Sequence, residues 1–253
     1  MELGRLSESL NHFRESLAIF QRSGNLHSTA KTLNSIAEVS RRQGYHRDAL
    51  DAYQKALSIY QGMGARQEGA TVMQNIGQIH IYKGNPERAL AEFRCALATF
   101  RQIRDFPGQA RAMCDFGDAY LAMDEYEQCL VYYQKAARTA EQVSNLYVRV
   151  IALRGIADSY RRSDRPEEAM RYYHDALKLA QEVEEPYQHA AILDGIAETM
   201  FRTGKPSTGR IYLRQAYDLY QVAGAIEAKS AELRLQMLDN PPVDGNSLPA
   251  STA

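Results

Sequence analysis

The sequence has no tryptophan, and only three cysteines and eight prolines among its 253 residues. Cys95, Cys114 and Cys129 form no CxxC pair, so we interpret them as buried or half-buried thiols rather than as disulfide partners or metal ligands. No apolar run approaches the roughly 20 residues of a membrane-spanning helix. The N-terminal residues also lack the basic start and apolar run of a signal peptide. We therefore expect a cytoplasmic protein without membrane contact.

Signatures of catalysis are missing as well. The six histidines show no HExxH or other metal-ligand spacing, and the chain contains no GxxxxGK(S/T), GxGxxG or GxSxG string. The net charge of −1 at pH 7 is far from the strongly basic face that nucleic-acid binding requires. We predict that the protein is not an enzyme, has no cofactor or metal, and makes no direct contact with nucleic acid.

What the sequence does contain is a repeat of 40 residues, which runs without insertion or deletion from Gly4 almost to the end. Three columns of this period are nearly constant: a turn column of Gly or Asp, an aromatic column nine residues later, and a small-residue column three residues further on. Their members are Gly4, Gly44, Gly84, Asp124, Asp164 and Gly204; Phe13, Tyr53, Phe93, Tyr133, Tyr173 and Leu213; and Ser16, Ala56, Ala96, Ala136, Ala176 and Ala216. A fixed period of this size indicates a stack of similar supersecondary units.

Between these columns apolar residues recur at helical spacing, as in Leu50, Tyr53, Leu57 and Tyr60. Several prolines stand where a helix would begin, a position that tolerates the missing N–H group. The pattern therefore predicts an all-α fold of about twelve antiparallel helices. Their predicted ranges are 5–23, 26–43, 45–62, 65–83, 86–103, 106–123, 125–143, 146–163, 166–183, 186–203, 206–223 and 225–239.

We predict three parts along the chain. Residues 1–24 form an unpaired or capping helix, residues 25–240 form five helical hairpins plus a terminal capping helix, and residues 241–253 form a disordered tail. Because Gly4 stands in the turn column, the helix at 5–23 has the register of a second helix that lacks its first. We interpret the chain as a domain excised from a larger protein, with a capping role for this helix as the alternative.

The columns resemble the tetratricopeptide repeat, a helix–turn–helix unit with small residues where its two helices touch. In the unit from Ala70 to Leu97 the family's positions are occupied by Met73, Ile76, Gly77, His80, Gly84, Ala89, Phe93 and Ala96. The small residues are Ala37, Gly77, Gly117, Ala157 and Ala197 on the first helices and Ala49, Ala89, Cys129, Ala169 and Gly209 on the second. A larger side chain in either column would push the hairpin apart. The resemblance implies a right-handed superhelical solenoid.

The 40-residue unit is longer than the usual 34 residues of the family. It resembles the C-terminal arrays of AfsR-like (SARP-type) bacterial transcriptional activators and of related nucleotide-binding signalling ATPases. This resemblance implies a protein- or peptide-binding scaffold that serves as the regulatory or sensor domain of a larger signalling or transcription regulator. The alternative is a free-standing sensor for a short signalling peptide or small molecule. Self-association through the helix at 5–23 is a third interpretation.

The resemblance also implies that the first helices line a concave groove. The implied groove residues are Asn34, Glu38, Arg41, Gln74, Gln78, Ile81, Tyr82, Asp118, Leu121, Arg154, Asp158, Arg161, Asp194, Glu198 and Arg202. They contain an acidic row, Glu38, Asp118, Asp158 and Glu198, and an apolar middle, which would suit a peptide with an apolar centre and charged flanks. The alternative is a solvated surface, because Glu38–Arg42, Asp158–Arg162 and Glu198–Arg202 have the i,i+4 spacing of simple helix ion pairs.

Overall fold

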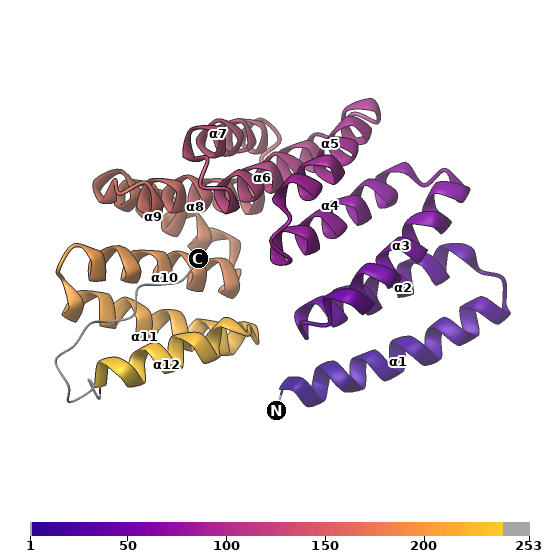
Figure 1. Cartoon of the computed structure of the whole chain (residues 1–253), viewed down its shortest axis with the longest axis horizontal. Helices are drawn as coiled ribbons and strands as arrows, with labels where there is room; N and C mark the ends of the chain where they lie inside the picture. Colours follow the sequence, from indigo (N-terminus) through magenta and orange to yellow (C-terminus); the bar gives the residue numbers. More distant parts are fainter. Residues whose placement is uncertain (1, 240–253) are drawn as a thin grey trace. The chain divides into compact units, whose positions relative to one another are not determined.

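A computed structural model of the chain describes residues 2–239, and within this range every element is an α-helix (Figure 1). The helices are α1 (Glu2–Arg22), α2 (Leu26–Arg42), α3 (His46–Met63), α4 (Arg66–Tyr82), α5 (Pro86–Gln102), α6 (Phe106–Ala122), α7 (Tyr126–Gln142), α8 (Leu146–Arg162), α9 (Pro166–Val183), α10 (Pro186–Arg202), α11 (Pro206–Ala223) and α12 (Glu227–Asp239). The predicted all-α repeat fold is confirmed, and only α1 departs from its predicted bounds by more than two residues. The tail predicted at 241–253 lies outside the described residues.

Neighbouring helices pair into antiparallel hairpins, and the chain divides into two compact units, residues 1–184 and 185–253. In the first unit, α2 pairs with α3, α4 with α5, α6 with α7, and α8 with α9. We call α2, α4, α6, α8 and α10 first helices and their partners second helices. The first helix α6 also lies against the first helices α4 and α8. In the second unit α10 pairs with α11, and α12 packs on α11.

Every turn between helices contains one residue with a positive φ angle, and these residues recur every 20 positions from Gly24 to Gly224. Six are glycines, and the other five are Arg104, Asp124, Ser144, Asp164 and Glu184, with φ between 52° and 59°. In ten of the eleven turns, all but the one at Glu184, the amide that follows bonds back to the last helical turn, as in Asn145 N to Ala140 O at 2.8 Å. This is the Schellman arrangement, which satisfies carbonyl groups at a helix end. The backbone period is thus half the sequence period.

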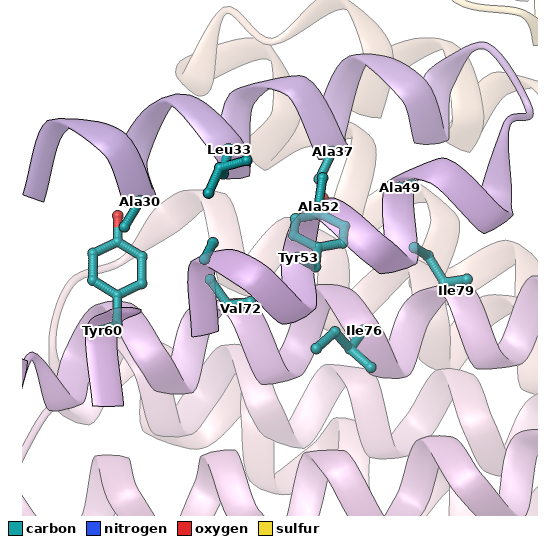
Figure 2. Packing of buried hydrophobic residues seen from close by; sticks show 11 residues of the cluster. Ala30, Leu33, Ala37, Ala49, Ala52, Tyr53, Tyr60, Val72, Ile76 and Ile79 are labelled. Atoms are coloured by element: carbon teal, nitrogen blue, oxygen red, sulfur yellow. The ribbon is translucent and has the colours of Figure 1, made fainter. Parts of the chain in front are cut away.

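The core of each hairpin is built from the aromatic and small-residue columns. Figure 2 shows one cluster, in which Tyr53 of α3 faces Ala37 of α2. The five aromatic-column residues of the hairpins, Tyr53, Phe93, Tyr133, Tyr173 and Leu213, are all buried. A Cβ atom added to Gly77 would lie 2.3 Å from the Phe93 ring, which explains why the facing column must stay small.

The cysteines correct one expectation. Cys114 and Cys129 are buried, but Cys95 is exposed. The reason is its register, because the equivalent positions one period away are the exposed Lys55 and Lys135. None of the helices between residues 2 and 239 is long and apolar enough to cross a membrane.

Candidate functional site

The first helices of the first unit carry the predicted groove residues on one side, which we call the first-helix face. It comprises the predicted Asn34, Glu38 and Arg41 on α2; Gln74, Gln78, Ile81 and Tyr82 on α4; Asp118 and Leu121 on α6; and Arg154, Asp158 and Arg161 on α8. We add Arg111 and Asp115 of α6, which lie on the same side of that helix. Contacts join these helices across the face. The guanidinium of Arg41 lies 6.0 Å from the centroid of the Tyr82 ring, and Gln74 donates a hydrogen bond to Asp115.

Three carboxylates of the predicted acidic row accept hydrogen bonds from phenols of the aromatic column. The hydroxyl of Tyr53 donates to Glu38 Oε2 at 2.9 Å, and the hydroxyl of Tyr133 donates to Asp118. The third pair, Tyr173 and Asp158, has the same geometry. Burial, together with the adjacent carboxylates, raises the pKa of these three phenols, so they remain donors at neutral pH. These carboxylates therefore tie the first helix of a hairpin to the second.

The arginines of the face pair mainly with carboxylates of their own helix. Arg41 holds Glu38 with two bonds, Nε to Oε2 at 3.0 Å and Nη2 to Oε1 at 2.5 Å. Arg154 Nη1 lies 3.1 Å from Asp158 Oδ2, and Arg161 Nη2 lies 3.6 Å from Asp158 Oδ1. Arg41, Arg154 and Arg161 are thus engaged in ion pairs within their own helices.

The predicted pair Asp158–Arg162 is wrong. Arg162 Nη2 instead donates to Asp124 Oδ1 at 2.7 Å, across the turn between α6 and α7 of the preceding hairpin. Asp158 is already paired with Arg154 and Arg161 of α8, and Asp124 offers Arg162 a direct hydrogen bond instead. The side chain of Arg42, in the predicted pair Glu38–Arg42, lies outside the described residues.

A buried polar network joins α4 to α6. Asp115 is 1% exposed, and it accepts hydrogen bonds from Gln74 Nε2 at 2.5 Å and Gln78 Nε2 at 2.8 Å. Gln78 Nε2 also lies 3.1 Å from Asp118 Oδ2. Arg111 Nε lies 3.7 Å from Asp115 Oδ1. Burial raises the pKa of Asp115 to about 7, against the opposing influence of Arg111.

We did not single out Asp115 from the sequence. The equivalent residues in the other hairpins are Ser35, Asn75, Gly155 and Gly195, so its column is one of small or neutral residues. A single carboxylate in a column of small or neutral residues is the sequence feature that could have identified Asp115 as functional.

The predicted apolar middle is only partly available on the surface. Ile81 and Leu121 are half-buried and pack against core clusters. Tyr82 is 61% exposed and stacks on His46, with ring centroids 5.7 Å apart. On α2, Asn34 is half-buried, and its Oδ1 atom has no hydrogen-bond partner within the described residues.

The three predicted groove residues of the second unit lie on α10. Arg234 of α12 donates to Asp194 Oδ1 at 2.7 Å, a bond between residues 40 positions apart. Glu198 is half-buried and Arg202 is exposed. The residue equivalent to the tyrosines of the first unit is Leu213, so Glu198 has no phenol at that position.

A family model described as tetratricopeptide repeat matches residues 1–62, 68–143 and 148–221. A search of the curated proteins found no match. Among solved structures, the chain is similar to aspartyl phosphate phosphatase F from Bacillus subtilis, with 18% identity and a TM-score of 0.66. The match covers 88% of this chain and 59% of that protein, so this chain is much shorter than that relative.

Two further similarities concern NprR in complex with its cognate peptide NprX, and a Signal Transduction ATPase with Numerous Domains from Pyrococcus horikoshii that carries a tetratricopeptide repeat sensor. The NprR match has 17% identity and a TM-score of 0.70, and covers 92% of this chain and 67% of NprR. The ATPase match has 18% identity and a TM-score of 0.63, and covers 94% of this chain and 36% of the ATPase. At these identities the likeness is one of fold.

Proposed function

This chain belongs to the tetratricopeptide repeat family, and we propose that it binds a peptide, either a short signalling peptide or a segment of a partner protein, on its first-helix face. The observation that carries this proposal is the Oδ1 atom of Asn34, which is buried without a hydrogen-bond partner in the described part of the chain. A buried acceptor left unpaired costs about 1–3 kcal/mol. Rotation of the Asn34 side chain would let a backbone N–H group of a bound peptide supply the missing donor.

The surroundings of Asn34 suit a peptide. Arg41 lies on the same side of α2, and beside it Tyr82 presents a largely exposed ring. An exposed aromatic ring next to charged groups is typical of sites that bind protein segments. The similarity to NprR, which was solved with its cognate peptide, supports the same class of ligand. We place the peptide in the groove that the family resemblance implies.

The wider role that we propose is regulatory or sensory, within a larger signalling or transcription regulator. Two similarities support it: the chain matches 36% of a signalling ATPase whose repeats are named as a sensor, and 67% of NprR. The likeness to AfsR-type activators belongs to the same proposal. A free-standing sensor for a short signalling peptide or small molecule, the alternative from the sequence, would use the same face.

The proposal can be tested by affinity selection from a pool of random heptapeptides, followed by isothermal titration of the retained peptides. We expect Asn34→Ala and Tyr82→Ala each to weaken binding about tenfold or more, which corresponds to about 1.4 kcal/mol. Tyr45→Ala is the matched control, because Tyr45 is 59% exposed and lies in the turn before α3, outside the first-helix face. Equal losses in all three variants, or no retained peptide, would contradict the proposal.

A further inference from the structure

We infer that a cavity formed by α1, α2 and α3 binds a small, neutral aromatic molecule such as a phenol or an indole. The cavity has a volume of about 490 Å³ and is partly open to solvent. Its lining residues on α2, Leu33, Ile36 and Ser40, lie on a different side of that helix from the first-helix face. The site is therefore separate from the proposed peptide site. The apolar residues that line it are Leu10, Leu17, Leu33, Ile36 and Ala52.

Two small residues of the lining, Ser40 of α2 and Ala52 of α3, stand where other hairpins carry large side chains. In two later hairpins both equivalent positions are tyrosines, and their rings stack with centroids 5.3 Å and 5.5 Å apart. The cavity thus corresponds to the space that a stacked pair of aromatic rings fills elsewhere in the same chain. The equivalent pairs are His80 and Glu92, Tyr120 and Tyr132, Tyr160 and Tyr172, and Met200 and Tyr212.

The first hairpin retains the cation that accompanies these rings. In the hairpin of α6 and α7, the Nζ atom of Lys135 lies 5.3 Å from the centroid of the Tyr132 ring. Lys55 of α3 is the equivalent residue, and it lines the cavity while it donates to Asp51 Oδ2 at 2.7 Å. An ammonium group is attracted to the face of an aromatic ring. A ring bound in the cavity would therefore meet the same cation that Tyr132 meets.

The size and charge of the cavity define the ligand further. Sites for small molecules have volumes of roughly 300–1,000 Å³ and mostly apolar linings with a few polar groups. Apolar cavities in proteins also bind aromatic molecules. Here the charged lining residues are Arg14 and Lys55, balanced by Asp48 and Asp51, so the site suits a neutral molecule. A phenol hydroxyl or an indole N–H group can donate a hydrogen bond to one of these two carboxylates.

The test follows the methyl NMR signals of Leu10, Leu17 and Leu33 while the protein is titrated with p-cresol, or with 4-methylcyclohexanol, which has a similar size but no aromatic ring. We expect p-cresol to shift these signals saturably and to bind at least about threefold tighter than 4-methylcyclohexanol, because only the aromatic ring attracts Lys55. Lys55→Gln should remove most of this preference. No saturable shift of these signals, or equal affinities of the wild type for the two alcohols, would overturn the inference.

Ala52→Tyr places in the cavity the side chain that Tyr132 has in its own hairpin, and it should weaken p-cresol binding at least about tenfold because the ring takes the place of the ligand. Gln128→Tyr is the matched control, since Gln128 is exposed on α7 and the variant adds the same side chain elsewhere. Ser40→Tyr fills the cavity from α2 and carries the test if circular dichroism shows that Ala52→Tyr does not fold. Unchanged affinity in a folded cavity-filling variant would contradict the assignment.

A second probe distinguishes a free molecule from a side chain of a partner protein. N-acetyltyrosinamide carries the ring of p-cresol on a peptide backbone, and we expect it to bind no tighter than p-cresol. Tighter binding would assign the cavity to a tyrosine of a partner protein and overturn the assignment to a small molecule. None of these titrations involves the first-helix face, so the proposal of peptide binding there stands or falls by its own experiment.

Discussion

The hydroxyl of Tyr173 donates a hydrogen bond of 2.5 Å to Oδ1 of Asp158, which lies 15 residues earlier on the other helix of the same hairpin. The hairpin of α4 and α5 lacks both partners of this bond. Phe93, which has no hydroxyl, replaces the tyrosine, and Gln78 replaces the carboxylate. In the first unit the two columns therefore vary together. The acidic residues that we assigned to ligand binding have a role inside the hairpins, whatever they contribute to a ligand.

Tyr173→Phe should destabilise the protein by about 1.5–3 kcal/mol, the usual range for a hydrogen bond to a charged group. Urea unfolding followed by circular dichroism measures this change. Tyr172→Phe is the control, because Tyr172 is half-buried and stacks on Tyr160, and its hydroxyl makes no hydrogen bond within the described part of the chain. Equal effects of the two substitutions would show that the Tyr173–Asp158 bond contributes nothing to stability.

Asp115→Asn should raise the melting temperature at pH 8. The folded pKa of Asp115 is raised to about 7 by burial, whereas an unfolded aspartate titrates near 3.9. A raised carboxyl pKa gives stability that is fully present below the unfolded pKa and is lost as the pH rises through the folded one. The wild type should therefore gain on the order of 1–3 kcal/mol relative to Asp115→Asn between pH 8 and pH 5.

The groups that act on Asp115 are the charged side chains of Arg111 and Asp118 on α6 and the neutral side chains of Gln74 and Gln78 on α4. Melting curves of both proteins at five pH values would check the prediction. A difference in stability that does not change with pH would contradict it.

Gly77→Ala should destabilise the protein by about 1–3 kcal/mol, because the new methyl group would lie 2.3 Å from the Phe93 ring and overpack the hairpin. Gly69→Ala is the matched control on the same helix. Its added Cβ would lie 3.7 Å from the nearest atom, in Leu57, so the substitution should be neutral or stabilise by about 0.5–1 kcal/mol. Chemical unfolding of the two variants measures the change in the free energy of unfolding. A change of the same sign in both variants would exclude the packing explanation.

Arg104→Gly should stabilise the protein by about 0.5–1 kcal/mol. Arg104 lies in the turn after α5 with a φ of 57°, a conformation that costs a residue with a side chain more than it costs glycine. Arg101→Gly, within the last turn of the same helix, should destabilise by about 1 kcal/mol instead. Differential scanning calorimetry of both variants separates the effect of the turn from the loss of an arginine.

The helices and the core could be predicted from the sequence because the 40-residue period repeats the same local chemistry many times. The aromatic and small-residue columns are strict, and each additional hairpin confirms the assignment of the previous one. The bonds between hairpins could not be predicted in this way. They join residues about 40 positions apart, such as Gln78 and Asp118 or Arg162 and Asp124, and depend on how far successive helices are rotated.

The candidate site was predicted less completely than the fold. Family resemblance indicated Asn34 and Tyr82, whose unpaired oxygen and exposed ring support the proposal, and their contact with a ligand stays a prediction. The family resemblance did not indicate Asp115, because it describes what a column has in common and Asp115 is the one residue that deviates from its column. The pairing of Tyr53 with Glu38 was visible in principle, since the two columns change together in the first unit.

The uniform turns have a consequence for how these helices find their partners. Every turn contains one residue with a positive φ angle at the equivalent position. The backbone conformation therefore does not distinguish a turn inside a hairpin from a turn between hairpins. Removal of 20 residues would leave a chain of equally well-formed turns in which every first helix had become a second helix. Only side chains oppose such a shift. The hydroxyls of Tyr53, Tyr133 and Tyr173 each bond a carboxylate on the preceding first helix, so these bonds form only when the helices pair in the native order. These phenols mark which neighbour a helix belongs to.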